Sequence, residues 1–373
     1  MTTWLPAAGC RLEDFRTLVE QTTDPADYPL AAGVEQNVLI YDRTILTDRP
    51  AALTELARAL MNGPGIVVLK DAFAADVVDR ATEVFTAMIE EQKAAGTAGG
   101  DHFAKPGEND RVWGALDKFA LRDPQAFAAY YDNDLLALVC TAWLGRGYQV
   151  TSQVNVVNPG GRAQVAHRDY HLGFMSREQA ERYPAHIHLL SPALTLQGAV
   201  AHVDMPVATG PTMYLPHSQK YPAGYVAFHQ PEFTAYFEEN HVQLPLAKGD
   251  AAFFNPALFH GAGTNRTTDV RRMANLLQIS SAFGRAMETV DRTAMCRALY
   301  PVLRSFRGDT GNVVAASAEG YAFPTNLDRD QPIGGLAPQT QAELMRQALA
   351  EEWDTSQFEK ALRDQQERRS AGA

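Results

Sequence analysis

The segment from residue 148 to residue 279 is divided into short runs of alternating or β-branched residues, and this division constrains the fold more than any other feature. One such run covers residues 153–157 (QVNVV). Turn signals separate the runs, for example at residues 158–161 (NPGG), 210–211 (GP) and 248–250 (KGD). Short strands between turns are typical of a β-sandwich or a β-barrel. We therefore predict a mainly β core of this kind.

Helical patterns flank this β region on both sides. Residues 51–61 are rich in Ala and Leu, and residues 75–93 have the period of a long amphipathic helix. Between them the apolar run GIVVL, at residues 65–69, suits a buried strand. After residue 286 the pattern is helical or irregular, and residues 339–369 predict a charged amphipathic helix on the outside of the molecule.

The chain has 373 residues, which suits one large domain or two ordinary ones. We predict a single catalytic domain over residues 1–373. Its N-terminal flank of helices and a strand covers residues 51–147, its β core residues 148–285 and its helical C-terminal flank residues 286–373. The predicted fold class is therefore α+β, with a mainly β core.

The composition excludes several classes of protein. A formal net charge of -11 opposes binding to phosphate backbones, so we expect no nucleic-acid partner. The sequence contains no run of about 20 apolar residues, so we expect no membrane span. Cys10, Cys140 and Cys296 are few, odd in number and far apart, which suits a reducing compartment and predicts a cytoplasmic protein. A metal ion would then be bound by His and carboxylate side chains.

A candidate metal site begins in the stretch AHRDY at residues 166–170. Side chains two residues apart on a strand share one face, so His167 and Asp169 can bind the same ion. His260, in FFNPALFHG, is the candidate third ligand on a later strand of the same barrel. Two His and one carboxylate leave three coordination positions open, an arrangement diagnostic of non-haem Fe(II) oxygenases.

Spacing alone does not identify the metal ligands, because His-x-Asp triplets often arise by chance. His202 and Asp204 have the same spacing, and His171 shares the face of Asp169. The choice among these residues depends on their context in the sequence.

The context is an ordered series of motifs that resembles the phytanoyl-CoA dioxygenase family of 2-oxoglutarate-dependent oxygenases, over roughly residues 60 to 285. The motifs are GIVVLKDAFAADVV (65–78), NVVNPGG (155–161), AHRDYH (166–171), AHVDMPVATGPTMYLPHSQK (201–220) and LAKGDAAFFNPALFHGAGTNRTTDVRR (246–272). This resemblance implies a double-stranded β-helix core (jelly-roll, cupin-like) and makes His167, Asp169 and His260 the metal-binding and catalytic residues. It makes Asp204 the Asp of the motif at residues 201–220 and leaves His202 without a catalytic role. Where the family has Pro-Gly-Ser-His this chain has PHSQ, so His217 is interpreted as structural.

The resemblance also implies the chemistry. The expected cofactors are Fe(II), 2-oxoglutarate as cosubstrate and O2, and the expected reaction hydroxylates an unactivated C–H bond of a small organic metabolite with release of succinate and CO2. Desaturation, cyclisation and epimerisation by the same oxidant remain open, as does a non-catalytic β-barrel binding protein. Asp169 argues against halogenation, because related halogenases have a small residue at that position.

A 2-oxoglutarate enzyme needs a cation for the far carboxylate of the cosubstrate, and Arg suits this role because its planar fork binds carboxylates bidentately. The family places this Arg eleven residues after the distal His, which predicts Arg271 rather than its neighbour Arg272. Gln153 and Asn155 share one face of a strand and are further candidates for binding 2-oxoglutarate, with a purely structural role equally open.

The substrate is not identified by any motif. Residues 101–118 and 173–194 are expected to form a lid over the site. Candidate substrate contacts are Arg111, Trp113, Tyr170, His171 and Phe174. A small molecule is the expected partner, no basic cluster suits the phosphates of CoA, and homodimerisation is left open.

Overall fold

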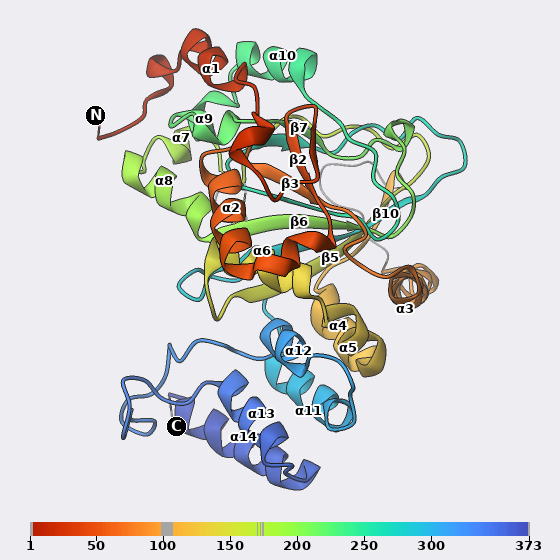
Figure 1. The fold of residues 1–373 in the computed structure, drawn as a ribbon, viewed down its shortest axis with the longest axis vertical. Helices are drawn as coiled ribbons and strands as arrows, with labels where there is room; N and C mark the ends of the chain where they lie inside the picture. The colour runs from red at the N-terminus through yellow and green to blue at the C-terminus, as the bar shows by residue number, and fades with distance from the viewer. Residues whose placement is uncertain (1–2, 98–106, 170, 172, 174, 372–373) are drawn as a thin grey trace.

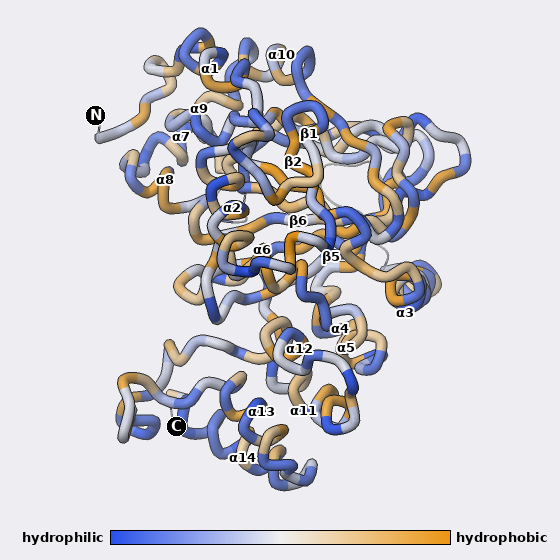
Figure 2. Tube along the Cα trace, viewed as in Figure 1, coloured by the Kyte–Doolittle hydropathy of each residue, from blue (hydrophilic) through white to orange (hydrophobic). Residues whose placement is uncertain are grey.

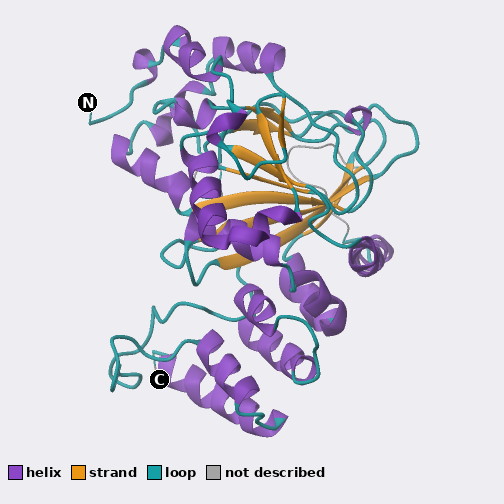
Figure 3. Cartoon of the chain, in the orientation of Figure 1, coloured by secondary structure: helices purple, strands orange, loops and turns teal. Residues whose placement is uncertain are grey.

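The structure, a computed structural model, describes residues 3–97, 107–169, 171, 173 and 175–371. A sheet of eight strands lies at its centre, with helices around it (Figures 1 and 3). In spatial order the strands are β1 (Gly33–Glu35), β2 (Val38–Tyr41), β3 (Ile66–Leu69), β8 (Ala251–Phe254), β6 (Thr195–Ala201), β10 (Arg272–Ser280), β5 (Gln149–Val157) and β4 (Asn109–Val112). β2 and β3 are parallel, and the other neighbouring pairs of this sheet are antiparallel.

A smaller sheet, formed by β7 (Met213–Leu215) and β9 (Phe259–Gly261), completes the barrel. Isolated bridges extend it on both sides, between His260 and His167 and between Tyr214 and Val242. Residues of both sheets line one cavity, which is consistent with the two layers of the expected double-stranded β-helix. Helices account for 44% of the residues and strands for 16%, so the description of the fold as mainly β is not confirmed.

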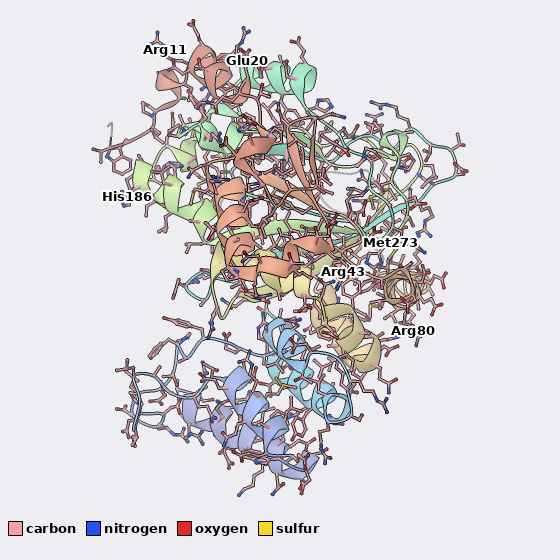
Figure 4. All side chains as sticks on the ribbon, viewed as in Figure 1. Arg11, Glu20, Arg43, Arg80, His186 and Met273 are labelled. Carbon is pink, nitrogen blue, oxygen red and sulfur yellow. The ribbon has the colours of Figure 1, made fainter. Side chains whose placement is uncertain are left out.

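β10 separates the inside of the barrel from its packed outer face. It pairs with β5 and β6, which places Leu276 opposite both Gln153 and Ala199. Because side chains alternate along a strand, one set of β10 residues faces the cavity and the other faces the helices. The first set is Arg272, Ala274, Leu276 and Gln278. Outward-facing Met273 (labelled in Figure 4), Leu277 and Ile279 belong to the main hydrophobic cluster.

The N-terminal elements that the sequence predicted are confirmed, with small shifts at their ends: α2 (Arg49–Met61), β3 and α3 (Ala75–Ala94). The side chain of Asp48 accepts the N–H of Ala51, and Pro50 occupies the first turn, so α2 begins where both signals favour a helix. Figure 2 shows α3 end-on, with hydrophobic and hydrophilic residues on different sides. Half of the large sheet, β1 to β4, lies before residue 148, where the predicted β core begins.

Further helices surround the sheet. They are α1 (Leu12–Val19), α4 (Ala115–Arg122), α5 (Pro124–Tyr131), α6 (Asp134–Leu144), α7 (Arg177–Ala180), α8 (Ala185–Ala193), α9 (Gly224–Ala227) and α10 (Pro231–Asn240). α7 and α8 occupy most of the segment 173–194, which is one of the two segments of the expected lid. The indole N–H of Trp143 on α6 donates to the carbonyls of Pro192 and Thr195, and these bonds attach the end of α8 to the body of the protein.

The C-terminal helices α11 (Arg292–Leu303), α12 (Thr310–Ser317), α13 (Gln341–Ala350) and α14 (Thr355–Arg369) gather at one end of the molecule (Figure 1). The prediction of one helix over residues 339–369 is wrong, because two helices cover this range. Glu352 has a φ of 53°, and Asp354 caps α14 by accepting the N–H of Gln357, so the chain turns between them. No helix in the described part of the chain has the length and apolar character that crossing a membrane requires.

Candidate active site

His167, Asp169 and His260 lie together inside the barrel and form the only group in the described residues with the geometry of a metal site. The backbone brings them together, because the N–H of His167 donates to the carbonyl of His260 at 2.9 Å and the reverse bond measures 3.1 Å. The Nε2 atom of His167 lies 3.9 Å from Asp169 Oδ1, and that of His260 lies 3.8 Å from Asp169 Oδ2. One ion between these atoms would contact all three side chains.

Both imidazole rings are oriented by backbone carbonyls. Nδ1 of His167 lies 2.9 Å from the carbonyl of Val165, and Nδ1 of His260 lies 2.8 Å from that of Leu258. A carbonyl only accepts, so Nδ1 carries the proton in each ring and Nε2 presents a lone pair to the site. Burial and the neighbouring His167 ring lower the pKa of His260 to about 4, which keeps this ring neutral near pH 7.

The two oxygens of Asp169 have different surroundings. Oδ2 accepts a hydrogen bond from the side-chain amide of Gln197 on β6. Oδ1 is buried, and no donor among the described residues reaches it. A buried carboxylate oxygen without a partner is costly, so this atom suits a metal ion that would complete its coordination. The residues present therefore fit the metal that the sequence implied, and Oδ1 of Asp169 would be available to bind it.

The alternative triplet at His202 and Asp204 is structural. Nδ1 of His202 lies 2.8 Å from Thr82 Oγ1, and Nε2 lies 3.0 Å from the hydroxyl of Tyr130. Complete burial lowers the pKa of His202 to about 3. Asp204 accepts the backbone N–H of Lys248 at 2.9 Å, outside the residues that line the barrel cavity. Neither residue belongs to the metal site.

His217 has a structural position as well. Its Nε2 lies 3.1 Å from Thr23 Oγ1, and its Nδ1 lies 3.1 Å from the carbonyl of Gly63 and 2.9 Å from Lys220 Nζ. Its backbone φ of 69° belongs to the altered turn that the sequence indicated.

The triad opens onto a cavity of about 170 Å³. Four predicted residues line it, Arg111, Trp113, Gln153 and Asn155. Trp113 and Met287 mark its mouth, because their exposed fractions are 37% and 39%. The NH1 group of Arg111 donates to Gln153 Oε1 at 2.8 Å, and the guanidinium lies 4.6 Å from the centre of the Trp113 ring.

Of the other predicted substrate contacts, the structure describes His171. His171 lies outside the lining residues, where its N–H donates to Ser191 Oγ at 2.9 Å and its Nε2 accepts the N–H of Arg285 at 3.3 Å. The expectation that His171 contacts the substrate therefore has no support. Tyr170 and Phe174, and residues 101–106 of the expected lid, lie outside the described residues.

The prediction that Arg271 enters the barrel is wrong, and Arg272 enters instead. Arg271 precedes β10, has a side chain that is 49% exposed, and pairs with Asp110 Oδ2 at 2.8 Å and Asn158 Oδ1 at 3.2 Å. Arg272, the first residue of β10, lies opposite Val157 with its side chain in the cavity. The register of β10 with β5 decides which Arg points inward. The inward Arg lies one residue later in the sequence than the spacing in the family predicts.

Arg272 is 6% exposed, and burial lowers its pKa to about 10. Tyr214 and Thr212 line the same part of the cavity. The NH1 group of Arg272 is buried, and it has no hydrogen-bond partner in the part of the chain that the structure describes. A buried cation without a counter-charge in a cavity suits an anionic ligand.

Comparison with known proteins agrees with this geometry. The sequence model of the family described as Phytanoyl-CoA dioxygenase (PhyH) matches residues 61–273, more than half of the chain. The chain belongs to the phytanoyl-CoA dioxygenase family. It is therefore a dioxygenase of the class that uses Fe(II), 2-oxoglutarate and O2, and its His-Asp-His triad is in place to bind the metal.

Curated relatives of this family member include two dioxygenases of fungi. "Dioxygenase trt7" of Aspergillus terreus (strain NIH 2624 / FGSC A1156) is 26% identical over 243 residues, which cover 63% of this chain and 76% of that protein. "Dioxygenase ALT11" of Alternaria alternata is 32% identical over 151 residues, 38% of this chain and 43% of that protein. The matched part thus spans less than half of ALT11.

Solved structures of similar fold include the non-heme alpha ketoglutarate dependent epimerase SnoN from nogalamycin biosynthesis. It is 22% identical, with a TM-score of 0.44, and the match covers 62% of this chain and 82% of that one. EctD from S. alaskensis in its apoform is 21% identical, with a TM-score of 0.45, and the match covers 61% of this chain and 78% of that one.

Proposed function

We propose that this PhyH-family protein oxidises a C–H bond of a small organic molecule, and that it couples this oxidation to the conversion of 2-oxoglutarate to succinate and CO2. For a hydroxylation, the substrate R–H, 2-oxoglutarate and O2 give R–OH, succinate and CO2. The observation that carries the proposal is the presence in one cavity of a three-residue metal site and a buried cation with a free N–H group.

We assign the far carboxylate of 2-oxoglutarate to Arg272. Its guanidinium lies in the wall of the same cavity as the triad, near Tyr214, and no carboxylate of the described residues pairs with it. Asn155 also lines this wall, and the oxygen of its side-chain amide is buried without a donor among the described residues. An amide can bind a carboxylate through its N–H groups, so Asn155 remains a second candidate for the cosubstrate.

Gln153 is reassigned from the cosubstrate to the mouth of the cavity. Its Oε1 is held by Arg111, and its Nε2 lies 3.4 Å from the sulfur of Met287, which is half-exposed. This position suits a contact with the substrate as it enters.

The chain itself binds and orients the ligands and excludes water from the site. The two imidazoles direct their Nε2 atoms into the cavity, and Gln197 leaves one oxygen of Asp169 without a donor, so these three side chains would hold a metal ion at the cavity wall. Apolar side chains such as Phe254 and Leu276 line the walls and limit the entry of water. Iron bound here with 2-oxoglutarate supplies the oxidising chemistry that attacks an unactivated C–H bond.

The test is the incubation of the purified protein with Fe(II), ascorbate, O2 and carbon-labelled 2-oxoglutarate, with extracts of small molecules as the source of substrate. We expect labelled succinate whose amount rises when the extract contains the substrate. The substrate gains one oxygen atom in a hydroxylation, loses two hydrogen atoms in a desaturation or cyclisation, and keeps its mass in an epimerisation. No iron binding and no succinate at any extract concentration would contradict the proposal.

A further inference from the structure

We infer that the substrate is an uncharged, largely apolar molecule with a hydroxyl group, and that three glutamines in the cavity wall, Gln153, Gln197 and Gln278, recognise it. This inference rests on the proposed function, because it concerns the substrate of the same site. It adds the chemical class of the substrate and the residues that select it.

The three side chains lie on neighbouring strands and face the same cavity. β10 lies between β5 and β6, and Gln278 on β10 is directly opposite Gln197 on β6. Gln153 on β5 is opposite Leu276, one inward-facing position along β10 from Gln278. All three residues line the cavity. We call this set the glutamine band.

Most other side chains of the large sheet that line the cavity are apolar, among them Ile66, Val68, Ala199, Ala252, Phe254 and Leu276. The polar exceptions on this sheet are Arg111, Asn155 and Arg272. A buried amide oxygen without a hydrogen-bond donor is costly, so such oxygens in a largely apolar wall indicate a ligand with complementary groups. Because the amides carry no charge, they do not neutralise a charged group of a ligand, and burying such a group without a counter-charge is costly.

The orientation of two amides is fixed by their partners. The carboxylate of Asp169 only accepts, so Nε2 of Gln197 points to it and Oε1 remains as an acceptor. The described residues offer no donor to this buried oxygen, although Gln197 is only 3% exposed. The guanidinium of Arg111 only donates, so Oε1 of Gln153 points to it and Nε2 remains as a donor.

The third amide strengthens the acceptor side of the band. The side-chain oxygen of Gln278 is also buried, with no donor in the described part of the chain, and it lies opposite Gln197 in the register. The band therefore presents acceptors beside the metal ligand Asp169 and a donor toward the mouth. A hydroxyl group is a small uncharged group that both donates to such an oxygen and accepts from such an N–H.

Charged substrates fit this wall less well. A substrate carboxylate at Gln197 would lie beside the carboxylate of Asp169, and like charges at short distance repel. Arg272 is assigned to the cosubstrate, and Arg111 is held by Gln153 and stacked on Trp113. A substrate ammonium group would need a carboxylate partner. Asp169 is the one carboxylate among the described residues that line the cavity, and it would be bound to the metal.

The experiment uses four bridgehead-substituted adamantanes as probes, because they share one rigid apolar cage and differ in a single group. They are the alcohol, the fluoride, the carboxylate and the amine. Each is titrated calorimetrically into the anaerobic protein loaded with Fe(II) and 2-oxoglutarate. We expect the alcohol to bind about 5- to 150-fold more tightly than the fluoride, which has a similar size but no O–H to satisfy the buried oxygens.

Two variants and one control locate the effect. Gln197→Leu and Gln278→Leu each remove a buried acceptor, so we expect the preference for the alcohol over the fluoride to fall to about 3-fold or less. Gln149→Leu is the matched control, because Gln149 lies on β5 outside the cavity and donates to the carbonyls of Ser281 and Gly284. This variant should keep the preference. If Gln197→Leu does not fold, the result with Gln278→Leu decides.

Three results would overturn the inference: equal binding of alcohol and fluoride, tighter binding of the carboxylate or the amine, and no binding of the alcohol at millimolar concentration. Titration of the same protein with Fe(II) and then with 2-oxoglutarate separates the two proposals. Binding of both, together with any of these results, refutes the glutamine band and leaves the proposed function intact. Failure to bind Fe(II) or 2-oxoglutarate refutes the proposed function itself.

Discussion

The assignment of Arg272 rather than Arg271 to the cosubstrate leads to a comparison of two adjacent substitutions. In Arg272→Met, the far carboxylate of 2-oxoglutarate would be buried with no counter-charge. Removing one partner of such a pair costs about 2–5 kcal/mol. The dissociation constant of 2-oxoglutarate should therefore rise by about 30-fold to several thousand-fold, at 1.4 kcal/mol per factor of ten.

Arg271→Met is the matched control. The Arg271 side chain is 49% exposed and pairs with the buried Asp110, whose carboxylate also pairs with Lys93. Because Lys93 still neutralises Asp110 and Arg271 is half exposed, losing this pair should cost about 0–1 kcal/mol, and 2-oxoglutarate binding should change by about 5-fold or less. Without ligand, Arg272→Met should be as stable as the wild type or more stable, because an apolar side chain replaces a buried cation without a partner among the described residues.

The assay is calorimetric titration of 2-oxoglutarate into the anaerobic Fe(II) protein, with the concentration dependence of succinate release as a second measurement. Thermal unfolding of each variant without ligand controls for loss of the fold. A larger loss of affinity in Arg271→Met than in Arg272→Met would refute the assignment. It would show that Arg271, and not Arg272, faces the inside of the barrel.

Three further predictions concern histidines. His260→Ala should lose the stoichiometric iron that metal analysis finds in the wild type. His241→Ala should keep it, because His241 packs on α10 with its Nδ1 near the carbonyl of Phe237. Iron in both variants would contradict the triad. His171→Ala should bind iron as the wild type does, since His171 lies outside the cavity lining; a lost site would show that the wrong residue of the AHRDYH motif was excluded. Burial lowers the pKa of His202 from 6.5 to about 3, so the unfolded chain binds the proton first as the pH falls between these values, and the free energy of unfolding should decrease there. In urea unfolding, His202→Gln should show a weaker decrease than the wild type. An unchanged pH dependence would mean that His202 is protonated in the folded protein.

The metal triad could be predicted from the sequence because its information is local. The alternation of side chains along a strand places His167 and Asp169 on one face, and the order of the motifs selects His260 over the other histidines. The resemblance to a family supplied the fold, and the two-layer barrel around the triad agrees with it.

Arg272 could not be predicted because its position depends on pairing between strands distant in sequence. Both faces of residues 271–279 contain apolar residues, so hydropathy does not distinguish them. The register with Val157 decides, and it is a tertiary contact. Gln197 was missed for a similar reason, since its role depends on the approach of β6 to Asp169. Its only signal in the sequence is a polar residue on the inward face of an apolar strand.

The break between α13 and α14 shows the limit of helical periodicity. Residues 339–369 keep a helical pattern throughout, and the signal that ends the first helix is local. Asp354 and Gln357 form a capping box, and this pair starts a new helix within a segment whose hydropathy alone predicts one.

The most direct test of the account is the crystal structure of the protein grown anaerobically with Fe(II) and 2-oxoglutarate, with anomalous diffraction measured at the iron edge. The account predicts one iron peak between His167 Nε2, Asp169 Oδ1 and His260 Nε2, with 2-oxoglutarate extending from the metal to the guanidinium of Arg272. Iron at any other residues, or a cosubstrate whose far carboxylate pairs with Arg271, would contradict it.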